Sequence, residues 1–217
     1  MTRRELASRI DHTLLRPDAR ADDIRALCAE AAGLGTASVC VNPVYVPLCR
    51  SLLDGSGVPV CTVVGFPLGA METAAKAFET MMAVRAGAAE IDMVLPVGAL
   101  RDGREEDVLR DIAAVVEAAG DNAVKVILET CLLTDAEIVS ACRLAEQAGA
   151  RFVKTSTGFS REGASAAHVR LMRAHTALKV KAAGGIRSTE QALTLLDAGA
   201  DRLGCSSTPA IVAGLPF

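Results

Sequence analysis

The chain repeats one three-residue pattern, alanine-glycine-alanine, at Ala86–Ala88, Ala148–Ala150 and Ala198–Ala200. Each copy follows an amphipathic stretch and leads directly into an apolar one. Glycine readily takes the left-handed backbone conformation that ends a helix, so each copy predicts a helix stop that feeds the next strand. The repeating unit is therefore a strand followed by a helix, and such units build a parallel sheet.

Eight units of this kind fit the 217 residues. The predicted strands are Ile10–Leu14, Ser38–Val41, Val58–Val64, Glu90–Leu95, Ala123–Glu129, Phe152–Thr155, Leu178–Ala182 and Arg202–Cys205. The predicted helices are Ala21–Ala32, Pro43–Leu53, Met71–Ala86, Glu105–Ala119, Asp135–Ala148, Ala164–Ala174, Thr189–Ala198 and a short last one from Pro209. Capping boxes, Thr134 with Glu137 and Ser188 with Gln191, support two helix starts. This count favours a single-domain (β/α)8 TIM barrel over residues 1–217, with an open doubly wound sheet as the alternative.

The composition, 51% hydrophobic and 23% charged, is that of a soluble globular protein. A net charge of −3 without basic runs argues against a nucleic-acid or anionic-membrane partner, and 3% aromatic residues leave no stacking platform for bases. No apolar run approaches eighteen residues, so neither membrane insertion nor secretion is expected. The seven cysteines form no CxxC pair, which predicts reduced thiols, a cytoplasmic location and no metal.

The active site of a (β/α)8 barrel lies at the carboxyl ends of its strands. Those ends are unusually polar in this chain. They carry Asp11, Thr13, Cys40, Asp92, Lys125, Lys154 and Lys181. Because side chains alternate along a strand, three lysines and several carboxylates can converge inside one mouth. Ion pairs that only fill the barrel are the alternative, but branched aliphatic side chains usually fill barrel interiors, so a functional site is favoured.

Lys154 stands where a short apolar strand becomes a polar, glycine-bearing loop. A neutral lysine amine can attack a carbonyl carbon and form a Schiff base. Lys181 is on the neighbouring strand, and two ammonium groups about 5 Å apart repel by roughly 3 kcal/mol at an effective dielectric near 20, which favours the neutral amine. Asp92 offsets part of this repulsion and is the carboxylate placed to shuttle protons. For a lone lysine, snorkelling from a strand end is the structural alternative.

Glycine- and serine-bearing loops follow the last three strands and supply backbone N–H groups of the kind that hold phosphate in barrels. Their candidate residues are Thr157, Gly158, Gly184, Gly185, Ser206 and Ser207. The chain has neither a Walker motif nor a GxGxxG motif, so no nucleotide cofactor is expected. Three such loops on neighbouring strands indicate an anion site that forms the other half of the site around Lys154.

Motifs along almost the whole chain resemble those of the deoxyribose-phosphate aldolase family of class I aldolases. The matching segments are Ile10–Leu15 (IDHTLL), Ser38–Pro43 (SVCVNP), Val64–Gly69 (VGFPLG), Glu90–Val94 (EIDMV), Val124–Thr130 (VKVILET), Phe152–Phe159 (FVKTSTGF), Val180–Arg187 (VKAAGGIR) and Gly204–Ser207 (GCSS). The KTSTG segment and the segment from Lys181 to Arg187 are each specific for this family on their own. Ala183, Cys205 and Thr208-Pro209 depart from the usual pattern beside the phosphate loops.

This resemblance implies reversible, metal-free and cofactor-free cleavage of 2-deoxy-D-ribose 5-phosphate to acetaldehyde and D-glyceraldehyde 3-phosphate, in deoxyribose phosphate catabolism. It implies that Lys154 is the Schiff-base lysine, Asp92 a proton donor and acceptor, and Lys181 the lysine that assists them. Asp11, Thr13, Cys40 and Lys125 are expected to contact the substrate with the phosphate loops; Cys40 has no histidine beside it that would favour a nucleophilic role.

Two other functions remain open from the sequence. One is a Schiff-base barrel aldolase for another phosphorylated sugar, and the other is a non-catalytic barrel that binds a phosphometabolite. The presence of Asp92, Lys154 and Lys181 together argues against the second, which needs only the phosphate loops. A homo-oligomer, either a dimer or a tetramer, is compatible with every one of these functions.

Overall fold

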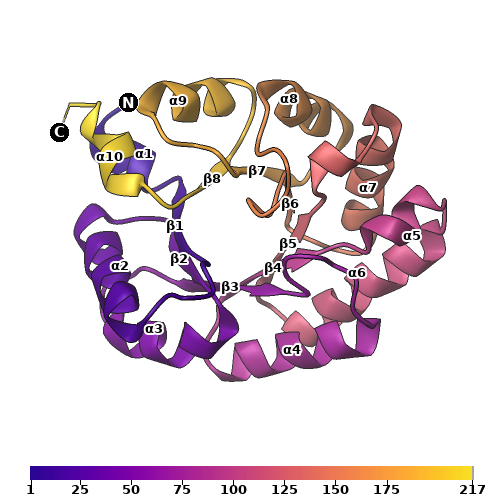
Figure 1. Cartoon of the computed structure of the whole chain (residues 1–217), viewed down its shortest axis with the longest axis horizontal. Helices are drawn as coiled ribbons and strands as arrows, with labels where there is room; N and C mark the ends of the chain where they lie inside the picture. The colour runs from indigo at the N-terminus through magenta and orange to yellow at the C-terminus, as the bar shows by residue number, and fades with distance from the viewer. Residues whose placement is uncertain (217) are drawn as a thin grey trace.

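The computed structural model describes residues 1–216 and forms a closed barrel of eight parallel strands (Figure 1). In chain order the strands are β1 (Ile10–Leu14), β2 (Ser38–Val41), β3 (Val60–Val64), β4 (Glu90–Val94), β5 (Ala123–Ile127), β6 (Phe152–Lys154), β7 (Lys179–Ala183) and β8 (Arg202–Cys205). Each strand pairs with the next, and β8 pairs with β1 to close the sheet. The predicted (β/α)8 barrel is confirmed, and the open sheet is wrong.

Helices ring the barrel on its outside (Figure 1). They are α1 (Arg3–Ala7), α2 (Ala21–Leu34), α3 (Val46–Leu52), α4 (Thr73–Arg85), α5 (Val97–Arg101), α6 (Glu105–Ala119), α7 (Asp135–Gln147), α8 (Ala166–His175), α9 (Thr189–Asp197) and α10 (Thr208–Ala213), with 3₁₀ turns η1 (Pro43–Tyr45) and η2 (Thr130–Leu132). The three alanine-glycine-alanine copies do end helices, because Gly87, Gly149 and Gly199 have φ of 107°, 83° and 107°.

Four strands are shorter than predicted: β4 and β6 each lack one residue at the end, and β3 and β5 differ by two residues for local reasons. The N–H of Val58 donates to Ser56 Oγ (3.1 Å), so Val58 still belongs to the loop before the strand, and β3 begins at Val60. Beyond β5, Glu129 takes a left-handed conformation with φ 56° and ψ 59°, which no strand can continue, and β5 ends at Ile127. The short helix α1 was not predicted; it starts with a capping box of Thr2 and Glu5.

Alternation along the strands separates an apolar core from a charged one. Ile91 and Met93 of β4 belong to the large apolar cluster formed with the surrounding helices, and both are completely buried. Asp92, between them, faces the barrel interior, where it meets lysines from three other strands. The apolar layer supplies the hydrophobic stabilisation, which leaves the barrel interior free for polar groups.

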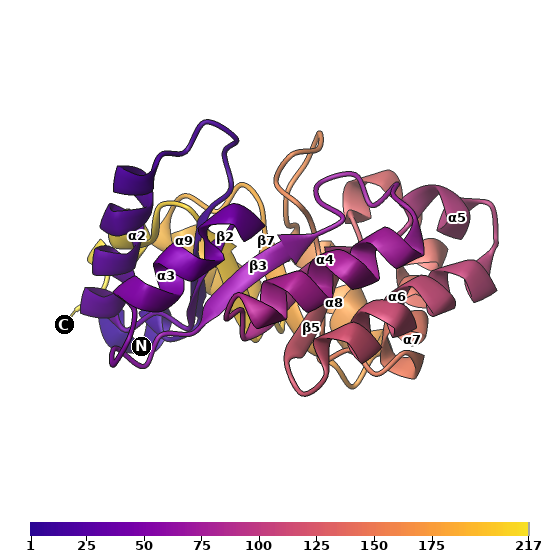
Figure 2. The same cartoon turned by 90° about the horizontal axis from the view of Figure 1, so that it is seen from below.

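The carboxyl ends of the strands define one face of the barrel. The loops that follow β1, β3 and β6 rise above this face, in indigo, purple and orange (Figure 2). The two described ends of the chain lie side by side, where the Arg3 N–H donates to the Pro216 carbonyl (2.9 Å) and α1 lies beside α10 (Figure 1). None of the helices in residues 1–216 combines the length and the apolar character needed to cross a membrane.

Candidate active site

Asp92 is the centre of a cluster of charged side chains inside the barrel. Its Oδ2 accepts hydrogen bonds from Lys154 Nζ (2.7 Å) and Lys181 Nζ (2.7 Å), and its Oδ1 accepts one from Lys125 Nζ (2.8 Å). Strand register explains this convergence, because Lys154 is paired with Lys181 across β6 and β7, and Asp92 with Lys125 across β4 and β5. The structure therefore brings together the three residues predicted to be catalytic.

A second layer of the cluster lies behind Asp92. Asp11 accepts hydrogen bonds from Lys181 (2.5 Å) and Arg202 (2.5 Å) and lies 3.5 Å from Lys125. Glu90 lies 2.6 Å from Lys125 and 3.4 Å from Arg202. Arg202 was not among the predicted site residues. It begins its strand, whereas the predicted site residues were sought near the carboxyl ends of the strands.

Mutual attraction keeps Asp92, Asp11 and Lys181 ionised despite their burial. Burial alone would raise the pKa of the Asp92 carboxyl, but the ammonium groups of Lys125, Lys154 and Lys181 hold it well below its usual range. Burial alone would likewise raise the pKa of Asp11, which Lys181, Lys125 and Arg202 lower. Conversely, burial would lower the pKa of Lys181, yet Asp11 and Asp92 raise it above the ordinary value. Asp92 thus remains an anion and Lys181 a cation near neutral pH.

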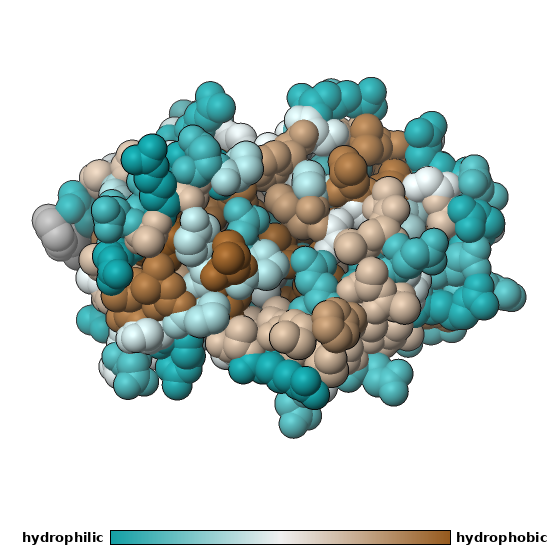
Figure 3. Space-filling model, turned by 60° about the horizontal axis from the view of Figure 1, so that its bottom comes forward, coloured by the Kyte–Doolittle hydropathy of each residue, from teal (hydrophilic) through white to brown (hydrophobic). Residues whose placement is uncertain are grey.

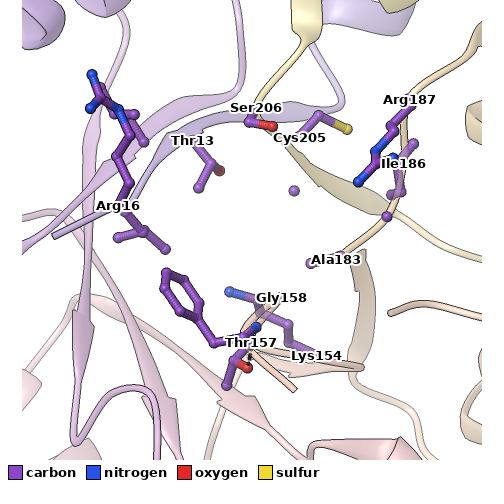
Figure 4. A pocket seen from close by; sticks show the side chains of 16 residues that line it. Thr13, Arg16, Lys154, Thr157, Gly158, Ala183, Ile186, Arg187, Cys205 and Ser206 are labelled. Carbon is purple, nitrogen blue, oxygen red and sulfur yellow. Dashed lines mark hydrogen bonds between the residues drawn. The ribbon is translucent and has the colours of Figure 1, made fainter. Parts of the chain in front are cut away.

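A pocket of about 360 Å³ opens above this cluster, and Lys154 is the one member of the cluster that lines it. Figure 4 shows the Lys154 amine directed into the cavity. Of the predicted substrate-binding residues, the lining includes Thr13, Thr157, Gly158, Gly184, Gly185 and Ser206. An amine in hydrogen-bond contact with a carboxylate therefore faces a space large enough for a small phosphorylated sugar.

The other predicted substrate-binding residues lie outside the lining of this pocket. Asp11 and Lys125 are completely buried inside the charged cluster. Cys40 is buried in a small apolar cluster with Leu15, Cys61, Val63 and Phe66. Ser207 precedes α10, where its carbonyl accepts from the Ile211 N–H (3.1 Å). Their predicted contact with substrate stays a prediction, and in this structure Asp11 and Lys125 contact other charged groups.

Two arginines at the pocket were missed by the sequence argument. Arg16 is paired with Asp18 (2.9 Å) and Asp23 (2.6 Å), so carboxylates already compensate its charge. Arg187 lines the pocket with its guanidinium turned inward (Figure 4). No ion pair is found for this guanidinium among residues 1–216, which leaves it available for an anion. The signal was present in the sequence, because Arg187 ends the segment that begins at Lys181.

Close backbone approaches shape the pocket floor. A Cβ at Gly204 would lie 3.2 Å from Lys181 Cε and 2.9 Å from the Ala183 Cβ, so this glycine leaves room for the buried lysine. Gly184, with φ of 90°, packs its Cα 3.0 Å from where a Cβ of Gly163 would lie. A Cβ at Gly184 would push the loop after β7 away from the loop after β6, and a Cβ at Gly204 would push β8 away from β7. These glycines therefore fix the distance between two walls of the pocket.

Glu129 holds one of these walls in place. Its carboxylate is buried, accepts from the Thr157 N–H (3.3 Å) and also binds the Thr157 hydroxyl. Thr157 Oγ1 in turn accepts from the Phe159 N–H (3.0 Å). The left-handed backbone of Glu129 costs free energy for a residue other than glycine. That cost is offset by anchoring Thr157, whose side chain lines the pocket.

Within residues 1–216, two groups of donors have metal-like spacing, namely the buried Cys40, Cys61 and Asp92, and Asp11, Cys61 and the partly buried Glu90. The Lys125 ammonium lies among them, 3.2 Å from Cys61 Sγ and 2.8 Å from Asp92 Oδ1. Burial raises the pKa of the Cys61 thiol, which disfavours the thiolate that metals bind. Lysine, rather than a metal ion, thus supplies the positive charge at this position.

A pocket-facing lysine beside a buried carboxylate and a second lysine, at the carboxyl end of a (β/α)8 barrel, suits Schiff-base chemistry on a carbonyl compound. The chain belongs to the DeoC/LacD family of aldolases, whose family model matches residues 6–208. It is 58% identical over 207 residues, 94% of each chain, to deoxyribose-phosphate aldolase of Streptococcus pneumoniae. It is 49% identical over 217 residues, 99% of each chain, to the Dictyoglomus turgidum protein of that name.

Solved structures agree with these sequence relatives. The tetrameric deoxyribose phosphate aldolase of Aeropyrum pernix superimposes with a TM-score of 0.93 at 36% identity, over 98% of this chain and 92% of that one. The resemblance predicted from the motifs is confirmed, together with the fold that it implied. The role of each site residue is a separate matter, because similarity of the whole chain does not test it.

Proposed function

We propose that this chain is a class I aldolase that reversibly cleaves 2-deoxy-D-ribose 5-phosphate to acetaldehyde and D-glyceraldehyde 3-phosphate, in the degradation of deoxyribose phosphate. Relatives of that name match it at 49% to 58% identity over nearly its full length. The observation that carries the proposal is the Lys154 amine, which faces the pocket while it contacts Asp92 at 2.7 Å.

In the cleavage direction, the neutral Lys154 amine adds to the aldehyde carbon of the open-chain sugar and forms a carbinolamine. Loss of water then gives an iminium ion at C1, which accepts the electron pair of the C2–C3 bond when that bond breaks. A base removes the proton of the C3 hydroxyl, the C2–C3 bond breaks, and glyceraldehyde 3-phosphate leaves with C3 as its new aldehyde. The two carbons that remain form an enamine on Lys154. Protonation at C2 and hydrolysis release acetaldehyde and restore the amine.

Asp92 and Lys181 support these proton transfers in different ways. Asp92 is the carboxylate next to the reacting amine, so it takes up and returns protons directly or through water. Lys181 contacts the same oxygen of Asp92 at 2.7 Å and remains charged, since its pKa is raised by Asp11 and Asp92. Its charge stabilises the Asp92 anion and disfavours a second ammonium at Lys154. Lys154 is therefore the nucleophile of the pair.

The phosphate of the substrate is held by the wall of the pocket that the loops after β6, β7 and β8 form. Gly158, Gly184, Gly185 and Ser206 line that wall with Arg187. Backbone N–H groups in glycine loops and an uncompensated guanidinium suit a dianionic group. Binding energy from this remote group orients the aldehyde carbon toward Lys154, which raises turnover as well as affinity.

Turnover assays test the proposal directly. Purified protein should release acetaldehyde from 2-deoxyribose 5-phosphate and should be much less efficient on unphosphorylated 2-deoxyribose. Arg187→Gln should raise the KM for the phosphorylated sugar and leave the efficiency on 2-deoxyribose nearly unchanged, which makes the unphosphorylated sugar an internal control. Equal efficiency on both sugars would contradict the phosphate wall. Activity on a different phosphorylated sugar alone would favour the second aldolase function, and binding without turnover would favour the non-catalytic barrel.

A homo-oligomer, a dimer or a tetramer, is the assembly that we propose. Figure 3 shows apolar side chains gathered on the face that carries α3 and α4. Its large exposed members include Leu52 of α3 and Phe78 and Met82 of α4, with Phe78 61% exposed. Such a face suits contact with a second copy. Light scattering should give a mass above that of the monomer, and Phe78→Glu should lower that mass. A monomeric wild type would contradict the assembly.

The cytoplasmic location stays a prediction from the sequence.

A further inference from the structure

The charged cluster continues beyond the catalytic residues to the opposite end of the barrel. Lys154 is the last residue of β6 and faces the pocket, whereas Glu90 and Arg202 are the first residues of β4 and β8. The side chains of Glu90 and Arg202 are 13% and 18% exposed. This end of the cluster is therefore reached by solvent from the side of the barrel away from the pocket.

Direct contacts join the two ends along two paths. On one path, Arg202 contacts Asp11 (2.5 Å), Asp11 contacts Lys181 (2.5 Å), and Lys181 shares Asp92 Oδ2 with Lys154. On the other path, Glu90 contacts Lys125 (2.6 Å), and Lys125 contacts Asp92 Oδ1 (2.8 Å). A change of charge at the far end thus reaches Asp92 through one or two buried partners.

All eight strands contribute to the surroundings of this cluster. The groups that face it are Asp11 (β1), Cys40 (β2), Cys61 (β3), Glu90 and Asp92 (β4), Lys125 (β5), Phe152 and Lys154 (β6), Lys179 and Lys181 (β7) and Arg202 (β8). Cys61 stays a neutral thiol because burial raises its pKa. Lys179 is exposed and lies 5.6 Å from the Phe152 ring, with no carboxylate within ion-pair distance in residues 1–216.

The ion-paired members of the cluster do not balance. The cations are Lys125, Lys154, Lys181 and Arg202, and the carboxylates are Asp11, Glu90 and Asp92, so four positive charges minus three negative charges leave one positive charge in excess. An uncompensated charge in a buried site is unfavourable, which favours release of one proton. Arginine does not release its proton in proteins.

Among the three lysines, the number of carboxylate partners differs. Lys125 lies within 3.5 Å of Asp11, Glu90 and Asp92, and Lys181 contacts two carboxylates. Lys154 contacts one, Asp92. Lys154, the lysine that faces the pocket, is therefore the amine of the cluster with the fewest carboxylate partners. Arg202 contributes to the excess positive charge, and Glu90 reduces it.

We propose that Arg202 and Glu90 are positioning residues that set the protonation of Lys154 from the far end of the barrel, Arg202 favouring the neutral amine and Glu90 opposing it. The proposal rests on the function proposed above, in which Lys154 acts as a neutral nucleophile. It assigns a role in the reaction to two residues that are separated from the pocket by the buried cluster.

Neutralising each residue with glutamine tests the proposal, because the two changes have opposite signs. Arg202→Gln removes the excess charge, so the pH midpoint for labelling of Lys154 by a slow amine-directed reagent should rise. Glu90→Gln raises the excess to two, so that midpoint should fall. Each shift should be roughly one pH unit, the effect of one charge about 10 Å away at an effective dielectric near 20. The acidic limb of the kcat/KM profile should move in the same direction as the labelling midpoint.

Three further variants separate charge from structure. The double variant Glu90→Gln/Arg202→Gln restores an excess of one, so its midpoint should return close to that of the wild type. Arg202→Lys keeps the charge and should also leave the midpoint near that of the wild type. Lys179→Gln removes a positive charge from the same end of the barrel without breaking an ion pair, and because Lys179 is exposed and solvent screens its charge, the midpoint should hardly move.

Opposite shifts that cancel in the double variant support the proposal. Shifts of the same sign, no shift in either variant, or a Lys179→Gln shift as large as that of Arg202→Gln would overturn it. If Arg202→Gln does not fold, Glu90→Gln must still lower the midpoint and Arg202→Lys must still preserve it. Peptide-level mass spectrometry reads labelling without the sugar substrate, so a wrong substrate assignment would appear as absent turnover with the midpoints still shifted.

Discussion

The protein holds buried lysines in two places, and the two places are built differently. Between α4 and α6, Lys76 donates to Asp111 (2.7 Å) and to the Val94 carbonyl (3.0 Å), while Thr73 donates to the other oxygen of Asp111 (2.8 Å). One cation meets one carboxylate, and the side chain of Lys76 has no exposed surface. Inside the barrel, cations outnumber carboxylates, and one amine opens onto a pocket.

This difference shows what turns a buried ion pair into a reactive group. A balanced pair with its remaining hydrogen bonds satisfied has no charge to expel, so it serves structure. A cluster with an excess of positive charge favours the loss of one proton. Where the amine that loses the proton faces a pocket, that amine can react with a substrate. Variants of the Lys76–Asp111 pair should therefore alter stability, and variants of the charged cluster in the barrel should alter turnover.

The largest effect on stability is expected at the helix pair. Lys76→Met should lower the free energy of unfolding by about 3 to 5 kcal/mol, because Asp111 is left buried without its cation. Turnover per folded molecule should stay near that of the wild type. Urea denaturation together with activity normalised to folded protein measures both. The double variant Lys76→Met/Asp111→Leu should recover much of the lost stability. A large loss of turnover in the folded Lys76→Met variant would contradict the separation of the helix pair from the active site.

The matching change in the barrel is expected to affect turnover. Asp92→Asn should reduce kcat by roughly 10² or more, because the proton carrier beside Lys154 is lost. Lys154 should remain at least as reactive toward an amine-directed reagent, since two positively charged neighbours then lack a shared carboxylate. Asp111→Asn, which removes the buried carboxylate of the helix pair, is the control and should keep its kcat. Near-normal turnover in Asp92→Asn would remove Asp92 from the mechanism.

Acid should lower the free energy of unfolding through the carboxylates of the barrel cluster. Near neutral pH this effect is absent. The pKa values of Asp11 and Asp92 are lower in the folded protein than in the unfolded chain. Below about pH 4 the unfolded chain takes up protons that the folded protein does not, so stability should fall by up to about 1.4 kcal/mol per pH unit for each carboxylate. Urea denaturation between pH 5 and pH 2 measures this slope. Asp11→Asn should have a shallower slope, and an unchanged slope would mean that Asp11 does not contribute.

Much of the fold follows from local patterns in the sequence. The alanine-glycine-alanine copies, the alternation of apolar runs and the capping boxes are all local, and β1, β2, β8 and α6 have the predicted bounds. The helices α1 and α5 were missed because five residues are too few to show a helical period. The left-handed turn at Glu129 was missed because its stabilising partner, Thr157, lies far along the chain.

The charged cluster was predictable only in part. Strand alternation correctly placed Asp92, Lys125, Lys154 and Lys181 inside the barrel, because the period of a strand depends only on its own residues. Contacts of Arg202 with Asp11 and Glu90 depend instead on how strands from opposite ends of the chain pair and tilt in the closed barrel. From the sequence, only the charges of Lys181 and Asp92 could be weighed against that of Lys154, so the charges of the complete cluster could not be counted.

The central claim, that Lys154 is the Schiff-base lysine, is tested most directly by chemical trapping. Borohydride reduction of the protein in the presence of acetaldehyde, followed by peptide mass spectrometry, should place one ethyl group on Lys154. Lys76, the buried lysine of the helix pair, should remain unmodified, and omission of acetaldehyde should abolish the product. The same group on Lys181 or Lys125, with Lys154 unmodified, would contradict the account.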